Sequence, residues 1–274
     1  MGRIMFTIRT NVAATQAKRD YRQSTNKITD SFERLSSGVR VTKASDDSAA
    51  LSVGTNLKAQ ITSLQQTARN ARDGLSLLQT MDGSLSAGQE LLSRLRQLTM
   101  QVISDGVGDN QRDMIRKDSG QVMNELSRLS EITEFNGSKP LNGSVNAFAF
   151  QIGTRGGTED YLNLDGQDMS AGALGLSGFS PTSSADLATV DAALTKLSDM
   201  RAQVGAAQNR LMSVLETIGS NTLSLSAGLS RVMDADVATE VAAVSNNQVL
   251  QQAGSSVISN SYEFSKTALR ILEK

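Results

Sequence analysis

The feature that most constrains the fold is a long apolar repeat in the C-terminal part of the chain. Leucine, valine and isoleucine recur at alternating intervals of three and four residues from Leu187 to Val232. Polar residues occupy three positions of this repeat, Arg201, Gln208 and Thr222. A 3.5-residue repeat of this length is typical of a coiled-coil stripe rather than of an ordinary globular helix. It predicts a helix of roughly 70 Å, in which we expect the polar positions to fix the register.

A second repeat with the same spacing lies in the N-terminal half, from Leu57 to Leu85, and its apolar face continues to Val102. Gly83 and Gly88 interrupt it, and each costs about 1 kcal/mol relative to alanine, so we expect the helix to relax there. The two repeats predict antiparallel helices packed side by side. The expected seam consists of Leu57, Ile61, Leu64, Leu75, Leu78, Leu194, Leu197, Val204, Leu211, Leu215, Ile218 and Leu225.

The segment between the two repeats changes character twice. Residues 111–133 predict a third helix, preceded by a turn at 104–110, with Ile115, Val122, Leu126, Leu129 and Ile132 facing inward. Residues 147–164 then alternate apolar and polar side chains around Gly156-Gly157, which predicts a β-hairpin. Residues 165–185 are small and polar and predict a loop. The expected fold is therefore mainly α, an elongated molecule of long antiparallel coiled-coil-like rods with one small hairpin.

The two ends of the chain carry few apolar residues. Residues 11–34 and 237–272 are compatible with helices but are rich in asparagine, glutamine, serine and threonine. Such segments bury too little apolar surface to offset their ordering entropy alone. We therefore expect them to become ordered only against other copies of the chain. Their expected packing residues are Val12, Ile28, Phe32, Leu35, Leu250, Val257, Ile258 and Leu269.

The stretch RLSSGVRVTKASDDSAALSV, residues 34–53, joins two predicted helices. It has one glycine and no GxxxxGK[ST] frame, which excludes a P-loop for phosphate. Adjacent aspartates could hold a divalent cation, but acidic residues before a helix more commonly cap it. We interpret Gly38 as the stop of the preceding helix and Ser45, Asp46 or Asp47 as the cap of the following one.

The composition argues against an enzyme. The chain has 274 residues and contains neither cysteine nor histidine. This removes thiol nucleophiles, the commonest general base and the commonest metal ligand. Glu90, Glu125 and Glu131 are the remaining candidate acids for glycoside hydrolysis, but they lie on predicted helices, where charges are usually solvated. We expect no catalytic site, no metal and no cofactor.

The net charge of −1 gives no basic excess for binding nucleic acid or an anionic membrane. No apolar run is long enough to span a bilayer, and the N-terminus lacks the apolar core of a cleavable secretory signal. We therefore expect neither nucleic acid nor a membrane as a partner. Export by a route that reads no such signal remains compatible with this sequence.

Several motifs resemble one family, the bacterial flagellins. ERLSSGVRVTKASDDSAALSV, ARNARDGLSLLQTMDGSL and RLSEITEFNGSKPLNG are similar to the N-terminal signature. AQVGAAQNRL, LSRVMDADVATEV and QVLQQAGSSVIS are similar to the C-terminal signature, in the same order and spacing. The hairpin FQIGTRGGTEDYLNLD also resembles the short sheet of that family. The Ile-x-Thr-Asn start of the family appears at Ile8–Asn11, which suggests that Met5 begins the native chain.

The resemblance implies a structural subunit of the extracellular flagellar filament, with an inner coiled-coil domain, D0, formed by the two paired ends of the chain, and a helical domain, D1. The outer domains D2 and D3 of longer flagellins would be absent. The implied parts are D0 at 1–40 and 234–274, the N-terminal helices of D1 at 41–140, its hairpin and loop at 141–186, and its C-terminal helix at 187–233.

The resemblance also implies partners. These are other copies in a helical polymer, the hook-associated junction and cap proteins, and a chaperone on the C-terminal segment before type III export. Some flagellins are sensed by the innate immune receptor Toll-like receptor 5 through a surface that also packs between subunits. The matching positions here are Arg94, Leu98 and Asp118. Two alternatives stay open: the hook–filament junction protein, which shares the SSG-R-V…SDD element, and a dimeric coiled-coil adaptor.

Overall fold

The structure is a computed structural model that describes the backbone of residues 11–272 and the side chains of residues 11–263 and 267. The expected Met5 start and the side chain of Leu269 lie outside the described residues. The predicted fold class is confirmed, because long helices dominate and the only named sheet in this part of the chain has two strands. The elements are α1 Val12–Ser37, α2 Ser48–Ile103, α3 Asp109–Ile132, β1 Ala147–Gln151, the 3-10 helix η1 Thr158–Asp160, β2 Tyr161–Asp165, α4 Ser184–Met233 and α5 Val237–Leu272.

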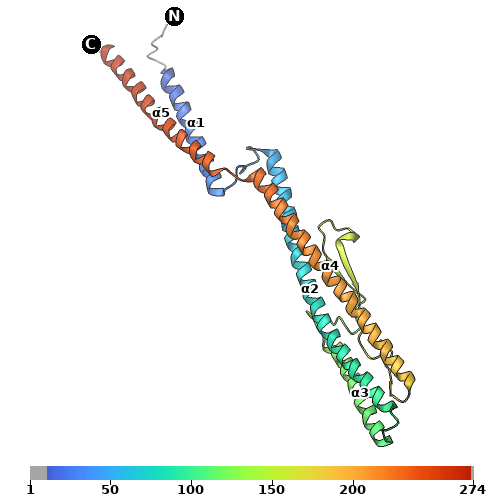
Figure 1. Ribbon diagram of the computed structural model, residues 1–274. Coiled ribbons are helices and arrows are strands. Elements are labelled where there is room, and N and C mark those ends of the chain that lie inside the picture. Colours follow the sequence, from blue (N-terminus) through green and yellow to red (C-terminus); the bar gives the residue numbers. More distant parts are fainter. Residues whose placement is uncertain (1–10, 273–274) are drawn as a thin grey trace. The chain divides into compact units, whose positions relative to one another are not determined.

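The chain divides into two compact units. The terminal unit comprises residues up to Ala59 and from Leu225 onward, and the bundle unit comprises Gln60–Ser224. In the terminal unit α1 and α5 lie side by side (Figure 1). We call these two helices the terminal pair.

The bundle unit is built from α2, α3 and α4 (Figure 1). The apolar repeats of α2 and α4 supply most of its core, which is fully enclosed at Leu78, Leu85, Leu92 and Leu95 of α2 and at Leu197 and Leu211 of α4. Every expected seam residue is buried or half-buried. A polar position of the α4 repeat joins the two helices. Arg201 donates from Nε to Asp82 Oδ1 at 3.0 Å and from Nη1 to Gln89 Oε1 at 2.5 Å. These bonds stabilise one register of α4 against α2.

Gly83 and Gly88 do not interrupt α2, which runs as one helix through both positions. At Gly88, a Cβ atom would lie 2.7 Å from Met169 Sδ and 3.3 Å from Leu197 Cδ2. At Gly83, a Cβ atom would meet nothing within 4 Å. The expected relaxation was wrong, since Gly88 instead allows the segment after β2 to pack directly on α2.

The segment between α3 and α4 contributes more to the core than its composition suggests. Residues 166–183 form the predicted loop, yet Met169, Leu174 and Leu176 are buried in it. Ile132 was predicted to face inward but is 54% exposed. At the end of α3, the buried positions are Ser130 and, just beyond the helix, Thr133. Ile132 lies between them in sequence but on the opposite, exposed face of the helix.

The β-hairpin forms where it was predicted, with a longer loop. β1 and β2 pair antiparallel, with Phe148 opposite Leu164 and Phe150 opposite Leu162. The strands are joined by residues 152–160 rather than by a tight Gly-Gly turn. The Asp160 carboxylate shapes this loop by accepting hydrogen bonds from the backbone N–H groups of Arg155 and Gly157, at 2.7 and 3.3 Å.

Candidate self-association surfaces

The terminal pair is an antiparallel coiled coil with a seam of mostly small and polar residues. Asn11 donates to the Ser261 carbonyl, Gln251 donates to Thr25, and Arg34 pairs with Glu240 at the other end. Its buried and half-buried positions follow the 3-4 alternation on both helices, at Ala14, Ala17, Tyr21, Ser24, Ile28, Ser31 and Leu35 of α1 and at Glu240, Val244, Asn247, Gln251, Gly254, Ile258 and Ser261 of α5. Small seam residues let helix axes approach closely.

Four of the expected packing residues lie outside this seam. Val12 is 67% exposed and Phe32 51% exposed on α1, and Leu250 and Val257 are exposed on α5. Their expected packing against other copies of the chain stays a prediction, while within the pair the helix phase turns the alanine and serine positions inward. Ile28, Leu35 and Ile258 are half-buried.

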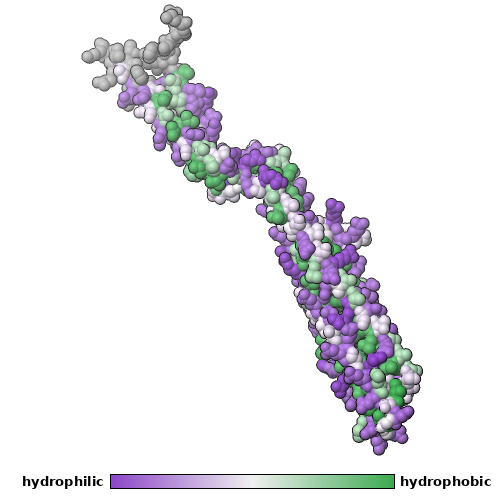
Figure 2. Space-filling model, in the orientation of Figure 1, coloured by the Kyte–Doolittle hydropathy of each residue, from purple (hydrophilic) through white to green (hydrophobic). Residues whose placement is uncertain are grey.

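These exposed side chains leave apolar surface on the terminal pair. Leu250 and Val257 line a shallow groove of about 370 Å³ whose floor includes Ala17, Ser24 and Gly254. In Figure 2, apolar residues reach the visible surface of the pair between polar ones. Val237, Val241 and Val249 of α5 are also exposed. Exposed apolar patches of this kind mark sites of protein–protein contact.

The two connectors of the terminal unit, residues 38–47 and 234–236, are bonded to each other. Gly38 ends α1 with a φ of 70° and its N–H donates to the Arg34 carbonyl at 2.8 Å. The Gly38 carbonyl then accepts from Ala235 N at 3.0 Å, and Arg40 N donates to the Met233 carbonyl at 2.6 Å. We call this set of backbone bonds the connector clamp.

Asp47, rather than Ser45 or Asp46, caps α2. Its Oδ1 accepts from Ala50 N at 2.9 Å, which satisfies one of the amides left open at the helix start. Asp46 instead folds back on the preceding turn and accepts from Lys43 N at 3.1 Å and Thr42 N at 3.2 Å. Ser45 is exposed within this turn.

Three aspartates at or just before helix starts share one kind of electrostatic environment. The backbone amides of Lys43 and Thr42 lower the pKa of Asp46, and the backbone amides of Thr182 and Ser183 lower the pKa of Asp186. The Thr239 hydroxyl, followed by nearby backbone amides, lowers the pKa of Asp236. In each case donors aimed at the carboxylate favour its charged form.

Because the folded state lowers the pKa values of these three carboxyl groups, we expect the protein to lose stability in acid. A depressed folded-state pKa contributes stability that is present above the unfolded value of about 3.9 and is lost as the pH falls through the folded pKa. We expect Asp186→Asn to lower the free energy of unfolding at pH 7, and we expect the difference from wild type to shrink at pH 3. Urea denaturation at the two pH values measures it. An equal difference at both would show that the charge of Asp186 is not what stabilises the turn.

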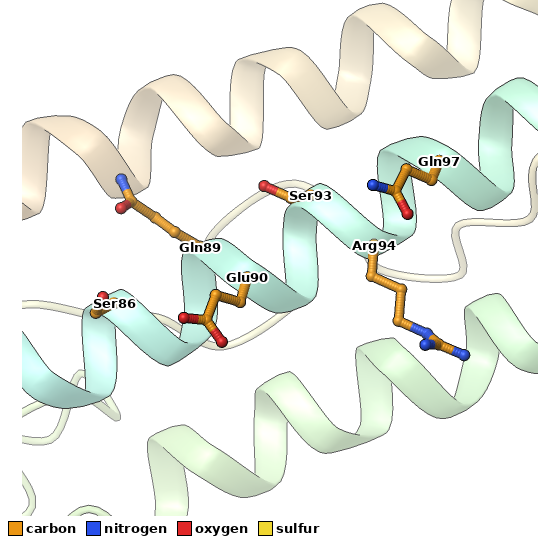
Figure 3. Close-up of a pocket in the computed structure, with 6 residues that line it drawn as sticks. All are labelled: Ser86, Gln89, Glu90, Ser93, Arg94 and Gln97. Atoms are coloured by element: carbon orange, nitrogen blue, oxygen red, sulfur yellow. The ribbon is translucent and has the colours of Figure 1, made fainter.

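The positions that resemble the receptor and packing surface lie on α2 and α3. Arg94 and Asp118 are exposed, whereas Leu98 is half-buried and packs against the core. Arg94 lines a shallow groove of about 390 Å³ with Ser86, Gln89, Glu90, Ser93 and Gln97. Figure 3 shows Arg94 extending on the α3 side of α2 and Gln89 on the α4 side, where it donates to Ser198 at 3.0 Å.

Two of the three candidate acids take part in ion pairs. Glu125 pairs with Arg128 and Glu131 pairs with Lys139, both as surface ion pairs. Within residues 11–272 no group of acidic side chains is placed to hold a metal ion. Of the helices that the structure describes, none is both long and apolar enough to cross a membrane.

Comparison with known proteins matches both halves of the chain to one family. Residues 8–146 match the model of the bacterial flagellin N-terminal helical region. Residues 187–272 match the model of the bacterial flagellin C-terminal helical region. These two segments contain α1, α2, α3 and α5 and all of α4 except its first three residues.

Curated relatives are similar over almost their whole length. Flagellin of Xenorhabdus nematophila is 33% identical over 310 residues, covering 97% of this chain and 98% of its own. Flagellin of Halalkalibacterium halodurans is 30% identical and covers 96% and 98%. The crystal structure of Bacillus cereus flagellin is 26% identical, with a TM-score of 0.48 over 55% of this chain and 88% of that chain. This chain therefore belongs to the bacterial flagellin family, the subunits of the flagellar filament.

Proposed function

We propose that this chain polymerises into a hollow helical filament outside the cell through two surfaces. The first is the exposed apolar surface of the terminal pair, and the second is the face of α2 and α3 around Arg94, Leu98 and Asp118. The observation that carries the proposal is the terminal pair itself: its seam is small and polar, while Phe32, Leu250 and Val257 stay exposed. Burying these side chains against other copies would contribute about 1.5–3 kcal/mol for each large apolar residue.

The two proposed layers of the filament correspond to different parts of the chain. Residues 1–40 and 234–274 form the inner layer, D0, and residues 41–233 form the helical layer, D1, with the hairpin and loop at 141–186. The enclosed core of the bundle unit supports this, because D1 has a stable interior of its own. The short segment between α3 and α4 leaves no room for D2 or D3.

The flagellin family consists of structural proteins rather than enzymes, and its members assemble with themselves. For this chain we propose further partners: the hook-associated junction and cap proteins at the filament ends, and an export chaperone on the C-terminal segment. The exposed apolar residues of α5, such as Leu250, support a chaperone, since they would otherwise be unprotected before export.

A seeded polymerisation experiment tests the proposal. Purified monomer is concentrated with short filament fragments and imaged by electron microscopy. We expect hollow fibres about 100–200 Å across, a width that follows from concentric layers of helices about 10 Å in diameter. A full-length variant with Leu250→Ser and Val257→Ser should grow poorly from the same seeds. Discrete dimers at every concentration and salt would instead identify a coiled-coil adaptor.

A further inference from the structure

Met233, one of ten methionines in the chain, packs into a notch that only glycine leaves open. It is the last residue of α4, and its side chain lies against Gly54 of α2, within the terminal unit. A Cβ atom at position 54 would lie 2.5 Å from Met233 Sδ and 2.7 Å from its Cγ. Gly54 is buried and Met233 is half-buried. The sulfur is therefore in close contact with the α2 backbone, while the residue as a whole is only half-buried.

The backbone of the same residue holds the connector clamp. The Met233 carbonyl accepts from Arg40 N, and the neighbouring Val232 carbonyl accepts from the Arg40 guanidinium at 2.9 Å. Ala235, two residues further on, donates to Gly38. Met233 therefore takes part both in the contact with Gly54, through its side chain, and in the connector clamp, through its backbone carbonyl.

We propose that Met233 is an oxidation site that controls the connector clamp, with a hydroperoxide such as hydrogen peroxide as the oxidant. The thioether sulfur attacks one peroxide oxygen, the S–O bond forms and the O–O bond breaks. Sulfur is oxidised by two electrons to the sulfoxide, and the peroxide is reduced to water after its proton moves to the departing oxygen. Methionine sulfoxide is polar and is reversible by methionine sulfoxide reductases.

The notch cannot hold the product. Sδ already lies against Gly54, so an oxygen bonded on that side of the sulfur would need space that the α2 backbone occupies. The sulfoxide oxygen also seeks water or a donor, and burying it without one is costly. The side chain must leave the notch, which frees the end of α4 and weakens the bonds from Arg40.

Other methionines provide an internal comparison. Met100, Met114 and Met212 are 54%, 67% and 46% exposed and belong to the bundle unit. Exposed thioethers react readily with peroxide, so these residues should be oxidised first. Their oxidation changes no packed contact of the clamp. The rate at which a methionine is oxidised is therefore distinct from the effect of its oxidation on the connector clamp.

Hydrogen–deuterium exchange on the full-length monomer tests the proposal without requiring polymerisation. Wild type, Met233→Leu and the control Met212→Leu are treated with hydrogen peroxide, and sulfoxide is located by peptide mass spectrometry. In wild type and Met212→Leu, we expect the amides of Arg40 and Ala235 to exchange about tenfold faster after oxidation, the factor for roughly 1.4 kcal/mol of local destabilisation. In Met233→Leu, which keeps an apolar side chain of similar volume, exchange should not change. Treatment with methionine sulfoxide reductases should restore wild-type exchange.

Two results would overturn the proposal. One is a Met233 that stays reduced at doses that fully oxidise Met100 and Met212. The other is a Met233 sulfoxide with unchanged exchange at Arg40 and Ala235. Met233→Gln, which places a polar group in the notch without peroxide, should reproduce the fast exchange. If untreated wild type failed to polymerise, the proposed function would fail, but this exchange result would stand independently.

Discussion

Deleting residues 1–40 and 234–274 together is expected to abolish polymerisation while leaving the rest of the chain helical. The bundle unit encloses its own leucine core on α2, α3 and α4, so it does not depend on the terminal pair for burial. The deletion removes every exposed apolar residue of the terminal pair, and with them one of the two proposed contact surfaces. Circular dichroism of the truncated chain should still show a largely helical protein, and electron microscopy should show no fibres even with seeds.

A full-length variant separates loss of contacts from loss of the helices. Phe32→Ser, Leu250→Ser and Val257→Ser together should leave the seam of the terminal pair intact, because all three side chains lie outside it. Seeded growth should nevertheless fall sharply, since each substitution removes about 1.5–3 kcal/mol of apolar burial between copies. If the chain lacking residues 1–40 and 234–274 still formed filaments, the bundle unit alone would be sufficient for assembly.

The second large effect is expected from two alanine substitutions in the same helix with opposite results. Gly88→Ala inserts a methyl group against Met169 Sδ, Leu197 Cδ2 and Leu126 Cδ1. Overpacking of this kind costs about 1–3 kcal/mol. Gly83→Ala meets open space and removes a flexible residue from a helix interior, which stabilises by up to about 1 kcal/mol.

Urea denaturation measures both variants against wild type. The midpoint should fall for Gly88→Ala and rise for Gly83→Ala, with the slope of the transition unchanged in each. Stabilisation by both substitutions would mean that Met169 moves aside at little cost and that the loop after β2 is not tightly packed on α2. Met169→Ala combined with Gly88→Ala should then show no coupling between the two sites.

The sequence predicted the elements whose signal is periodic and apolar. The repeats beginning at Leu57 and Leu187 correspond to α2 and α4, and the glycine-containing turn at 104–108 separates α2 from α3. These features are local, because a helix period and a turn are encoded by residues that are neighbours along the chain. The family resemblance rested on the same regions and was confirmed over nearly the whole chain.

Other features depend on contacts between distant segments, and the sequence alone could not supply them. Met169, Leu174 and Leu176 lie in a small-residue segment without periodicity, so nothing local marks them as core. Ile132 is apolar and falls within a helix, yet the turn of α3 at its end places Ser130 inward instead. The notch at Gly54 likewise becomes visible only when Met233 of α4 is placed against it.

The pairing of the two ends was implied by the family resemblance, but the residues of its seam were not predicted. The seam keeps a 3-4 spacing, but alanine, serine and glycine carry little apolar signal, and the larger residues Phe32 and Leu250 lie outside it. A search for the spacing of small residues would have found Ala14, Ala17 and Ser24. The polar bonds across the pair, such as that from Gln251 to Thr25, have no sequence signature of their own.

A seam made of such small side chains has a consequence for how α1 and α5 are aligned. Sliding α1 along α5 by seven residues, about 10 Å, would exchange Ala17, Ser24 and Ser31 for one another, and these three side chains are similarly small. Packing at these three positions therefore discriminates weakly between neighbouring alignments, and the polar contacts at Arg34–Glu240 and Gln251–Thr25 help to select one of them. Replacing those polar side chains by alanine would leave two helices that still adhere but no longer share a single offset.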